Sequence, residues 1–328
     1  MRPTGALISS SDRRTSSPPG RLRRRNVKPN DGFSLKEYLV ERKALIDRAL
    51  AGYLPDEGNG QPVIFQAVRY SLFAGGKRLR PILCLAAAEA VGREAGALLP
   101  VACALELIHT YSLIHDDLPA MDNDDYRRGR LTSHKVFGEG IAILAGDALL
   151  TESFRLLTRR ELMPGISPEL LLHVTGEIAE AAGYFGMIGG QVLDIRSEEE
   201  PVDLETLHLI HRLKTGALIR VSLRAGAILA GAAGTELASL SDYGRQIGLA
   251  FQIADDILNV EGDRALLGKG TGSDAARGKV TFPALLGIEA SRARAEALII
   301  EALAALASFD VRAEPLRAIA RYILVRNS

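Results

Sequence analysis

Tryptophan is absent from this chain, and aromatic residues of all kinds make up only 5% of its 328 positions. Stretches with the two-residue alternation of a half-buried strand are also hard to find. Alanine and leucine dominate instead, and both are strong helix formers. A hydrophobic fraction of 47% over this length is enough for a large core in one or two domains. We therefore predict an all-α protein.

Cysteine is scarce as well, and Cys84 and Cys103 are the two examples. Both lie in apolar stretches with a helical pattern, and neither has neighbours at the spacing of a metal site. We interpret them as reduced core residues, which is compatible with a cytoplasmic protein.

Net charge is also missing, since 40 basic and 40 acidic residues cancel at neutral pH. The balance is uneven along the chain, because residues 1–30 carry +7 and the remainder carries −7. A net acidic body argues against sequence-independent binding of nucleic acid. No apolar run reaches the roughly 20 residues of a membrane helix without interruption by charge or glycine, so we expect no integral membrane segment.

Residues 1–32 are rich in serine, arginine, proline and glycine and show almost no apolar periodicity. We predict a disordered basic extension here, ahead of one folded domain that spans residues 33–328. The arginine-rich, acid-poor composition superficially resembles an organelle transit peptide. We favour a flexible tail, or a start placed too far upstream, and assign the extension no catalytic role.

The most unusual feature that is present is a crowd of carboxylates between Leu113 and Arg128. Five aspartates fall within ten positions and two arginines follow them: Asp116, Asp117, Asp122, Asp124, Asp125, Arg127 and Arg128. Carboxylates this close repel one another and need basic side chains or hard metal ions beside them. An acidic surface loop is the simpler interpretation, but apolar segments on both sides place the run at the end of a buried helix. An EF-hand is excluded because the sixth position is not glycine.

A glycine pair, Gly75 and Gly76, leads into Lys77, Arg78 and Arg80 at the start of an apolar helix. Backbone amides, the helix dipole and the side-chain charges all favour an anion at this point. Taken alone the pattern is weak, because solvated lysine and arginine are common near helix starts.

A long apolar helix is predicted from Leu98 to His115, and it contains His109. His109 precedes Asp116 by seven residues, which is two turns along the same face, or about 10 Å. A lone histidine is most often a satisfied core residue. One that faces a charged cavity can donate to a phosphate, so we retain His109 as a candidate.

A second carboxylate cluster lies on another apolar helix, where the spacing puts four polar residues on one face. These residues are Gln252, Asp255, Asp256 and Asn259. Two helices that end in carboxylates can oppose one another across a cavity.

Lysine also interrupts a predicted helix from Leu204 to Ala233, within the triplet Lys214-Thr215-Gly216. A lysine in an apolar stripe needs either solvent or a charge, and a lysine that reaches solvent is the alternative here. We interpret Asp194 to Asp203 as a polar connection. The loop from Gly268 to Gly278, with Lys269 inside it and Lys279 after it, does not have the spacing of a P-loop.

Two carboxylate clusters and at least four cationic sites indicate a strongly anionic ligand that is held through bridging divalent cations. Magnesium fits best, since it takes few carboxylates, several waters and phosphate oxygens. Diphosphate is the obvious candidate, and the apolar helices beneath the clusters indicate a greasy substrate body.

These segments together resemble the short-chain trans-isoprenyl diphosphate synthases, such as bacterial farnesyl and geranylgeranyl diphosphate synthases. The resemblance extends from about residue 34 to residue 328. It rests on GGKRLRP at Gly75 to Pro81, DDxxxxD followed by RRG at Asp116 to Gly129, KTG at Lys214 to Gly216, and FQxxDDxxD at Phe251 to Asn259. It implies a single-domain bundle of about ten or more helices around a central apolar cavity.

The resemblance also implies a role for each motif residue. Magnesium is bound by Asp116, Asp122 and Asp255, with Asp117 and Asp256 in support and Lys214 in the same catalytic group. The allylic diphosphate is held by Arg127, Lys214, Thr215, Gln252 and Lys269. Isopentenyl diphosphate is held by Lys77, Arg80, His109 and Arg128, and Gly76 is a further substrate-binding residue. Three magnesium ions per active site with diphosphate bound, and a cytoplasmic homodimer, are implied as well.

The implied reaction begins with metal-assisted loss of diphosphate to give an allylic cation. The isopentenyl double bond attacks this cation, and the released diphosphate takes the proton. An apolar cavity poor in water would protect the cation from hydrolysis. One departure from the family pattern is Asn259, where a third aspartate is usual, so we expect weaker metal affinity rather than loss of function.

Tyr111 is the candidate for the residue that limits product length, since it lies five residues before Asp116 and about 7.5 Å deeper along the helix. A ring at that depth is expected to floor the pocket and stop the product near fifteen carbons, although an ordinary core aromatic is the alternative. In the family, a bulky aromatic at this position resembles farnesyl-making members. We therefore predict farnesyl diphosphate, with geranylgeranyl diphosphate as the second choice.

Two other classes of protein are alternatives to this interpretation. A non-catalytic partner subunit of a prenyl synthase predicts eroded aspartates and lysines, whereas nearly all of them are present here. A terpene cyclase is expected to lack the isopentenyl site, so Lys77, Arg80 and His109 argue against it.

Overall fold

The computed structural model of the protein describes residues 32–55, 61–198, 200–261 and 279–325. The predicted basic extension of residues 1–32 lies outside the described residues apart from Gly32. The loop from Gly268 to Gly278, including Lys269, also lies outside them. All statements about structure below concern the described ranges.

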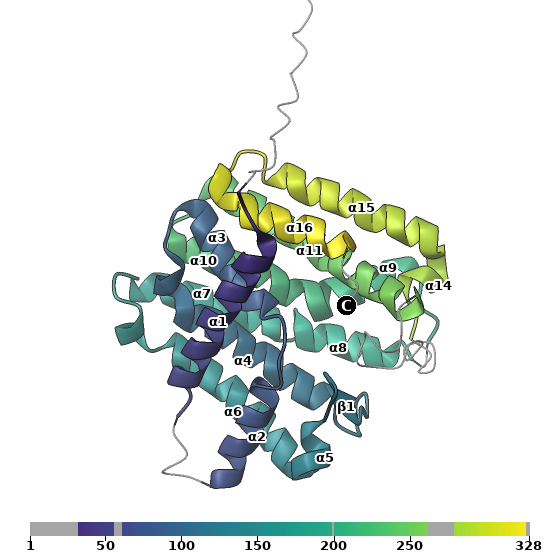
Figure 1. Ribbon diagram of the computed structural model, residues 1–328. Helices are drawn as coiled ribbons and strands as arrows, with labels where there is room; N and C mark the ends of the chain where they lie inside the picture. Colours follow the sequence, from purple (N-terminus) through teal and green to yellow (C-terminus); the bar gives the residue numbers. More distant parts are fainter. Residues whose placement is uncertain (1–31, 56–60, 199, 262–278, 326–328) are drawn as a thin grey trace, which may run out of the picture. The chain divides into compact units, whose positions relative to one another are not determined.

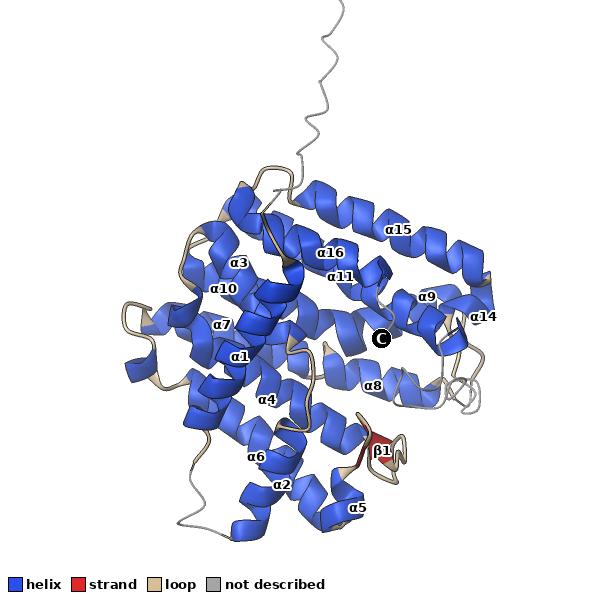
Figure 2. Ribbon diagram, in the orientation of Figure 1, coloured by secondary structure: helices blue, strands red, loops and turns tan. Residues whose placement is uncertain are grey.

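The described chain is a bundle of helices, as predicted, and it contains one two-stranded hairpin (Figures 1 and 2). The α-helices are α1 (Leu35–Tyr53), α2 (Pro62–Leu72), α3 (Leu79–Val91), α4 (Leu99–Asp116), α5 (Ser133–Phe137), α6 (Glu139–Leu157), α7 (Pro168–Ala182), α8 (Met187–Arg196), α9 (Leu204–His211), α10 (Ala217–Ala230), α11 (Gly234–Glu261), α14 (Phe282–Leu286), α15 (Ile288–Ala305) and α16 (Glu314–Val325). The shorter elements are the 3-10 turns η2 (Ala95–Leu98), η3 (Arg160–Leu162) and η5 (Val311–Ala313), the π turn η4 (Arg212–Gly216), and the antiparallel strands β1 (Tyr126–Arg127) and β2 (Arg130–Leu131).

Helix α4 runs through the middle of this bundle and packs against α6, α3, α10 and α1 (Figure 1). Its side chains are apolar almost all round, and most of them are buried, as expected for a helix with neighbours on every side. The segment Ala95–Asp116 is long and apolar enough to cross a membrane by length and composition, although Gly96 and Glu106 interrupt it. Within this segment, 72% of its apolar 18-residue stretch is buried inside the bundle, as expected for the core helix of a bundle.

Local sequence signals set several of the helix starts. Ser34 precedes α1, and its Oγ accepts a hydrogen bond from the backbone N–H of Glu37 at 3.3 Å. Ser167 and Asp203 cap α7 and α9 in the same way. Such caps satisfy backbone donors that the first turn of a helix leaves without partners.

The predicted helix from Leu204 to Ala233 is broken, which corrects the sequence analysis. Helix α9 ends at His211, the π turn η4 follows, and α10 then begins at Ala217. The break coincides with a close approach of α8, because a Cβ atom on Gly190 would lie 2.2 Å from the backbone nitrogen of Lys214. A π turn widens the helix locally and is often found at functional sites.

Candidate active site

The acidic stretch begins where α4 ends, and its second aspartate is tied to the hairpin that follows. Asp117 is 3% exposed and accepts three hydrogen bonds from Arg127, from Nε at 2.7 and 2.8 Å and from Nη2 at 2.5 Å. The hairpin β1–β2 turns the chain back so that Arg127 reaches the end of α4. Asp117 therefore positions Arg127, and its predicted support of magnesium binding stays a prediction.

The surroundings of Asp116 disfavour its ionised form. Burial raises the pKa of its carboxyl to about 6, and the neighbouring Asp122 adds to the effect, while Lys214 opposes it. A bound cation would stabilise the ionised form of this carboxylate. Asp116 is thus poised to gain from a metal ion.

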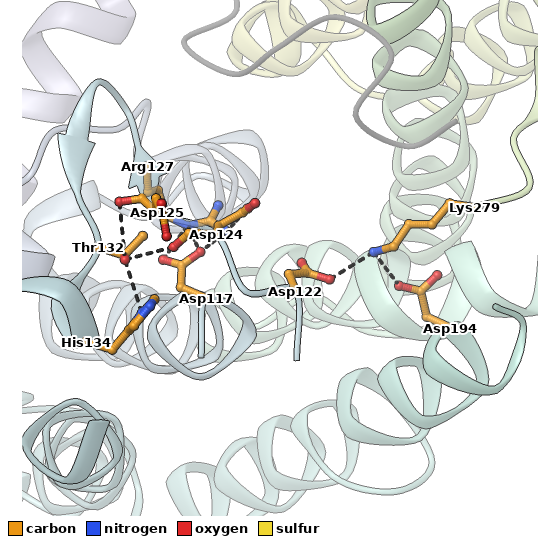
Figure 3. A network of polar contacts seen from close by, with 9 residues as sticks. All are labelled: Asp117, Asp122, Asp124, Asp125, Arg127, Thr132, His134, Asp194 and Lys279. Atoms are coloured by element: carbon orange, nitrogen blue, oxygen red, sulfur yellow. Dashed lines mark hydrogen bonds and ion pairs between the residues drawn. The ribbon is translucent and has the colours of Figure 1, made fainter. Parts of the chain in front are cut away.

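Asp122, Lys279, Asp194 and Lys214 form a chain of four alternating charges near Asp116, and Figure 3 shows the first three of them. The Nζ atom of Lys279 donates to Asp122 at 3.0 Å and to Asp194 at 3.3 Å. Asp194 accepts a second hydrogen bond, at 2.6 Å, from the Nζ atom of Lys214. The chain joins the acidic stretch, α8, η4 and the segment before α14.

Two members of this chain were not identified from the sequence. Asp194 was interpreted as the start of a polar connection, but it lies inside α8. Lys279 was noted only beside a loop. One signal could have located Asp194: the pair Gly189-Gly190 predicts a close backbone approach, and Asp194 lies one turn beyond it on the same face of the helix.

The second aspartate segment is connected to this chain through η4. Thr215, next to Lys214, donates from its hydroxyl to the Oε1 atom of Gln252 at 3.1 Å, and the amide of Gln252 donates to Asp256 at 3.2 Å. Asp256 is 3% exposed and also accepts the backbone N–H of Phe282 at 3.0 Å. Asp256 therefore fixes α11 against its neighbours, while Asp255 and Asn259 lie on the same helix.

The predicted isopentenyl residues line a separate cavity of about 500 Å³. Its cationic and polar lining includes Gly76, Lys77, Arg80, His109 and Arg128, and Ile219 and Phe251 add apolar surface. The Nε atom of Arg80 is buried and has no hydrogen-bond partner among the described residues. Burial lowers the pKa of Arg80 to about 10, so the group stays charged at neutral pH. Burial, together with Arg80 and Arg128, holds the pKa of His109 well below its ordinary value, so His109 is neutral there.

Gly76 and Arg128 form the rim of this cavity and depend on each other. Arg128 donates to the carbonyl oxygen of Gly75. A Cβ atom on Gly76 would lie 2.6 Å from the guanidinium of Arg128, and the φ angle of Gly76 is +119°. The backbone conformation therefore favours glycine at this position, and any side chain here would also have to move the guanidinium of Arg128.

Arg78 anchors the same loop from beneath. It is 2% exposed, and it donates from Nε to Asp47 at 2.8 Å, from Nη1 to Glu106 at 2.8 Å and from Nη2 to the carbonyl of Leu72 at 2.7 Å. Its backbone is left-handed, with φ at 53°. The guanidinium of Arg78 is therefore fully engaged by protein groups, unlike what is predicted for its neighbours Lys77 and Arg80.

Replacing Glu106 with glutamine is expected to lower the free energy of unfolding by about 3 kcal/mol, since it removes the more deeply buried of the two carboxylates that pair with the guanidinium of Arg78. Chemical denaturation measures this difference. As a control, Glu152→Gln breaks a pair with Arg155 at the surface and should change stability by less than about 0.5 kcal/mol. Similar small losses in both variants would contradict the anchoring role.

Tyr111 lies below Asp116 on α4 and is 5% exposed. Its ring packs edge-on against His115, with the centroids 5.7 Å apart. Burial, together with Asp116, raises the pKa of its hydroxyl to about 12. The hydroxyl has no hydrogen-bond partner among the described residues, so the ring contributes volume rather than a polar contact.

The acidic side chains are suited to magnesium. Within the described ranges, no three histidine, cysteine, aspartate or glutamate side chains converge on a metal site. Magnesium, however, uses one or two carboxylates together with waters and phosphate oxygens rather than a cage made only of protein. Asp116 and Asp122 supply such carboxylates, and the raised pKa of Asp116 reflects a charge that lacks sufficient compensation.

Comparison with known proteins agrees with this geometry. Residues 61–312 match the family model described as polyprenyl synthetase. The chain belongs to this family. It is therefore a prenyltransferase of isoprene biosynthesis, and the resemblance noted in its motifs is confirmed.

Relatives and solved structures in the polyprenyl synthetase family cover nearly the whole chain. A geranylgeranyl diphosphate synthase of Cyanophora paradoxa is 46% identical over 90% of this chain and 98% of its own length. A farnesyl diphosphate synthase of Geobacillus stearothermophilus is 44% identical over 90% and 99%. The crystal structure of an FPP/GFPP synthase from Zymomonas mobilis aligns with a TM-score of 0.79 at 41% identity, over 88% of this chain and 98% of that one. These similar proteins differ in the products that their names state.

The structure brings the predicted site residues together in two groups. The first contains Asp116, Asp117, Asp122, Arg127, Lys214, Thr215, Gln252 and Asp256, which hydrogen bonds or electrostatic interactions connect. The second contains Gly76, Lys77, Arg80, His109 and Arg128. Asp255 lies on α11 beside Asp256. Lys269 lies outside the described residues, and the individual ligand contacts of all these residues stay predictions.

Proposed function

We propose that this prenyltransferase condenses isopentenyl diphosphate with dimethylallyl and geranyl diphosphates in a magnesium-dependent reaction that yields farnesyl diphosphate. The observation that carries the proposal is the pair of distinct polar sites above one apolar interior. One site combines Asp116 and Asp122 with Lys214, and the other gathers Arg80, His109 and Arg128 without a matching number of carboxylates. Two anionic substrates require two such sites.

The residues of each site have separate tasks in this proposal. Arg127, fixed by Asp117, and Lys214 face the allylic diphosphate and stabilise the charge that develops as it leaves. Arg80 and Arg128 orient isopentenyl diphosphate so that its double bond lies next to the carbon that reacts. The buried apolar helices exclude water, and the departing diphosphate is the nearest base for the proton.

Magnesium would be held by Asp116, Asp122 and Asp255. When bound, it would supply Lewis-acid stabilisation of the leaving diphosphate. The chain's own cations supply further charge at the same place, with Lys214 reaching Asp194 at 2.6 Å.

Farnesyl diphosphate is proposed as the product because Tyr111 fills the space beneath Asp116. Geranylgeranyl diphosphate is the second candidate, favoured by the similarity to a relative with that name. Purified protein incubated with isopentenyl diphosphate, magnesium and each allylic primer tests both, with chain length read by mass spectrometry. A fifteen-carbon product is expected. A twenty-carbon product would favour the second candidate, and no turnover with any primer would favour a non-catalytic subunit.

Asn259 stands where the family usually has an aspartate, and an amide oxygen is a weaker ligand than a carboxylate. The Asn259→Asp variant is therefore expected to reach half-maximal activity at a magnesium concentration about threefold lower than the wild type does. A magnesium titration of the initial rate measures the shift. An unchanged magnesium dependence would count against a metal-linked role for this position.

A homodimer is proposed as the working form, as the family resemblance implies. Tyr184 and Phe185, which are 80% and 74% exposed, precede α8, and Ile188, Val192 and Ile195 follow on one exposed face of that helix. Contiguous exposed apolar surface of this kind is typical of an interface. Light scattering coupled to gel filtration distinguishes a dimer from the 35.2 kDa monomer.

A further inference from the structure

The ammonium of Lys279 lies between two carboxylates that come from separate parts of the fold (Figure 3). Asp122 belongs to the stretch after α4, and Asp194 belongs to α8. The distances from Nζ are 3.0 and 3.3 Å, and the three side chains are only 14%, 15% and 16% exposed. Charges this well enclosed are screened far less than surface pairs, so Lys279 neutralises both carboxylates effectively.

The two carboxylates differ in what else they contact. Asp194 also accepts a hydrogen bond from Lys214 at 2.6 Å. Burial would raise the pKa of Asp194, but Lys214 and Lys279 together outweigh burial and hold it below its ordinary value. Asp194 therefore stays ionised and can hold Lys279 even when Asp122 is engaged elsewhere.

We propose that Lys279 is an internal counter-cation of Asp122, which a divalent metal ion has to displace before the acidic stretch can bind it. This inference rests on the proposed function, because it takes Asp122 as a metal ligand. An ammonium and a divalent cation repel each other strongly when they contact the same carboxylate. Asp194 keeps the displaced Lys279 close by. Metal binding therefore frees the ammonium of Lys279 from Asp122, at the place where the diphosphate would enter.

Manganese, followed by its electron paramagnetic resonance signal, reports metal binding without turnover. The full chain is titrated with manganese alone and again with inorganic diphosphate present. In the absence of diphosphate, Lys279→Met is expected to bind manganese about tenfold more tightly than the wild type, because the competing charge is gone. Lys279→Arg keeps the charge and should bind with wild-type affinity, to within about twofold.

Lys135→Met is the matched control. It also removes a lysine that pairs with an aspartate of the acidic stretch, since Lys135 pairs with Asp125 at 2.7 Å, but it leaves the pair of Lys279 and Asp122 in place. Its manganese affinity should stay within about twofold of the wild type. An equal gain in Lys135→Met would show a general effect of charge and overturn the inference, as would unchanged or weaker binding in Lys279→Met.

The same titrations separate failure of this inference from failure of the proposed function. Wild-type protein that binds no manganese even with diphosphate would overturn the magnesium chemistry, and the inference with it. The inference alone would be overturned if the wild type binds manganese with diphosphate and the Lys279→Met variant has the same manganese affinity as the wild type. Circular dichroism of each variant confirms that the helices are retained.

Discussion

Replacing Asp116 with asparagine is expected to lower kcat about a thousandfold at saturating substrates. The change keeps the size and one oxygen of the side chain, but it removes the charge that a divalent cation requires. Burial and the nearby Asp122 already raise the pKa of Asp116 to about 6. The ionised form of Asp116 is therefore destabilised, and a bound cation would stabilise it. Steady-state kinetics with isopentenyl and geranyl diphosphates measure the loss.

Asp125 provides the control within the same acidic stretch. It is exposed and pairs with Lys135 at 2.7 Å, so Asp125→Asn should leave kcat within about twofold of the wild type. Equal losses of kcat in the two variants, or no loss in Asp116→Asn, would contradict the proposed role of Asp116 as a metal ligand.

Replacing Tyr111 with alanine is expected to move the main product from fifteen carbons to twenty or more. The ring is 5% exposed and lies directly below the acidic end of α4, so its removal opens a cavity of roughly the size of one isoprene unit. Mass spectrometry of the dephosphorylated products measures the distribution. The free energy of unfolding should also fall by about 3 kcal/mol.

Tyr111→Phe separates volume from polarity. The hydroxyl of Tyr111 has no hydrogen-bond partner among the described residues, so its removal leaves no other polar group unsatisfied. We expect the phenylalanine variant to keep the fifteen-carbon product and the wild-type stability. A product that lengthens equally in both variants would show that the ring does not form the floor.

Much of the fold could be predicted because it depends on local signals. The apolar run that ends at Asp116 predicts α4 almost to the residue, and Ser34 predicts the start of α1. The break at Lys214 could not be predicted in this way. It depends on the approach of Gly190 from another helix, and no property of residues 204–233 alone encodes that contact.

The site shows the same division. A dense run of aspartates can be recognised as a candidate site from the sequence alone, because carboxylates that close repel one another and need cations nearby. Asp194 and Lys279 are each unremarkable in sequence, and they are 85 positions apart; their meaning arises only from the contact between them. Likewise, the backbone N–H of Phe282 donates to Asp256 from a separate element, and the pattern on α11 alone could not predict that contact.

The buried guanidinium of Arg78 has a thermodynamic consequence for substrate affinity. Its three partners, Asp47, Glu106 and the carbonyl of Leu72, belong to α1, α4 and the end of α2. The shape of the loop around Gly76 is therefore linked to the folding of three helices rather than to its own residues. A substitution that loosens any of these helices would increase the fraction of molecules in which the proposed isopentenyl pocket is distorted. Apparent affinity for that substrate would then fall before the protein as a whole unfolds.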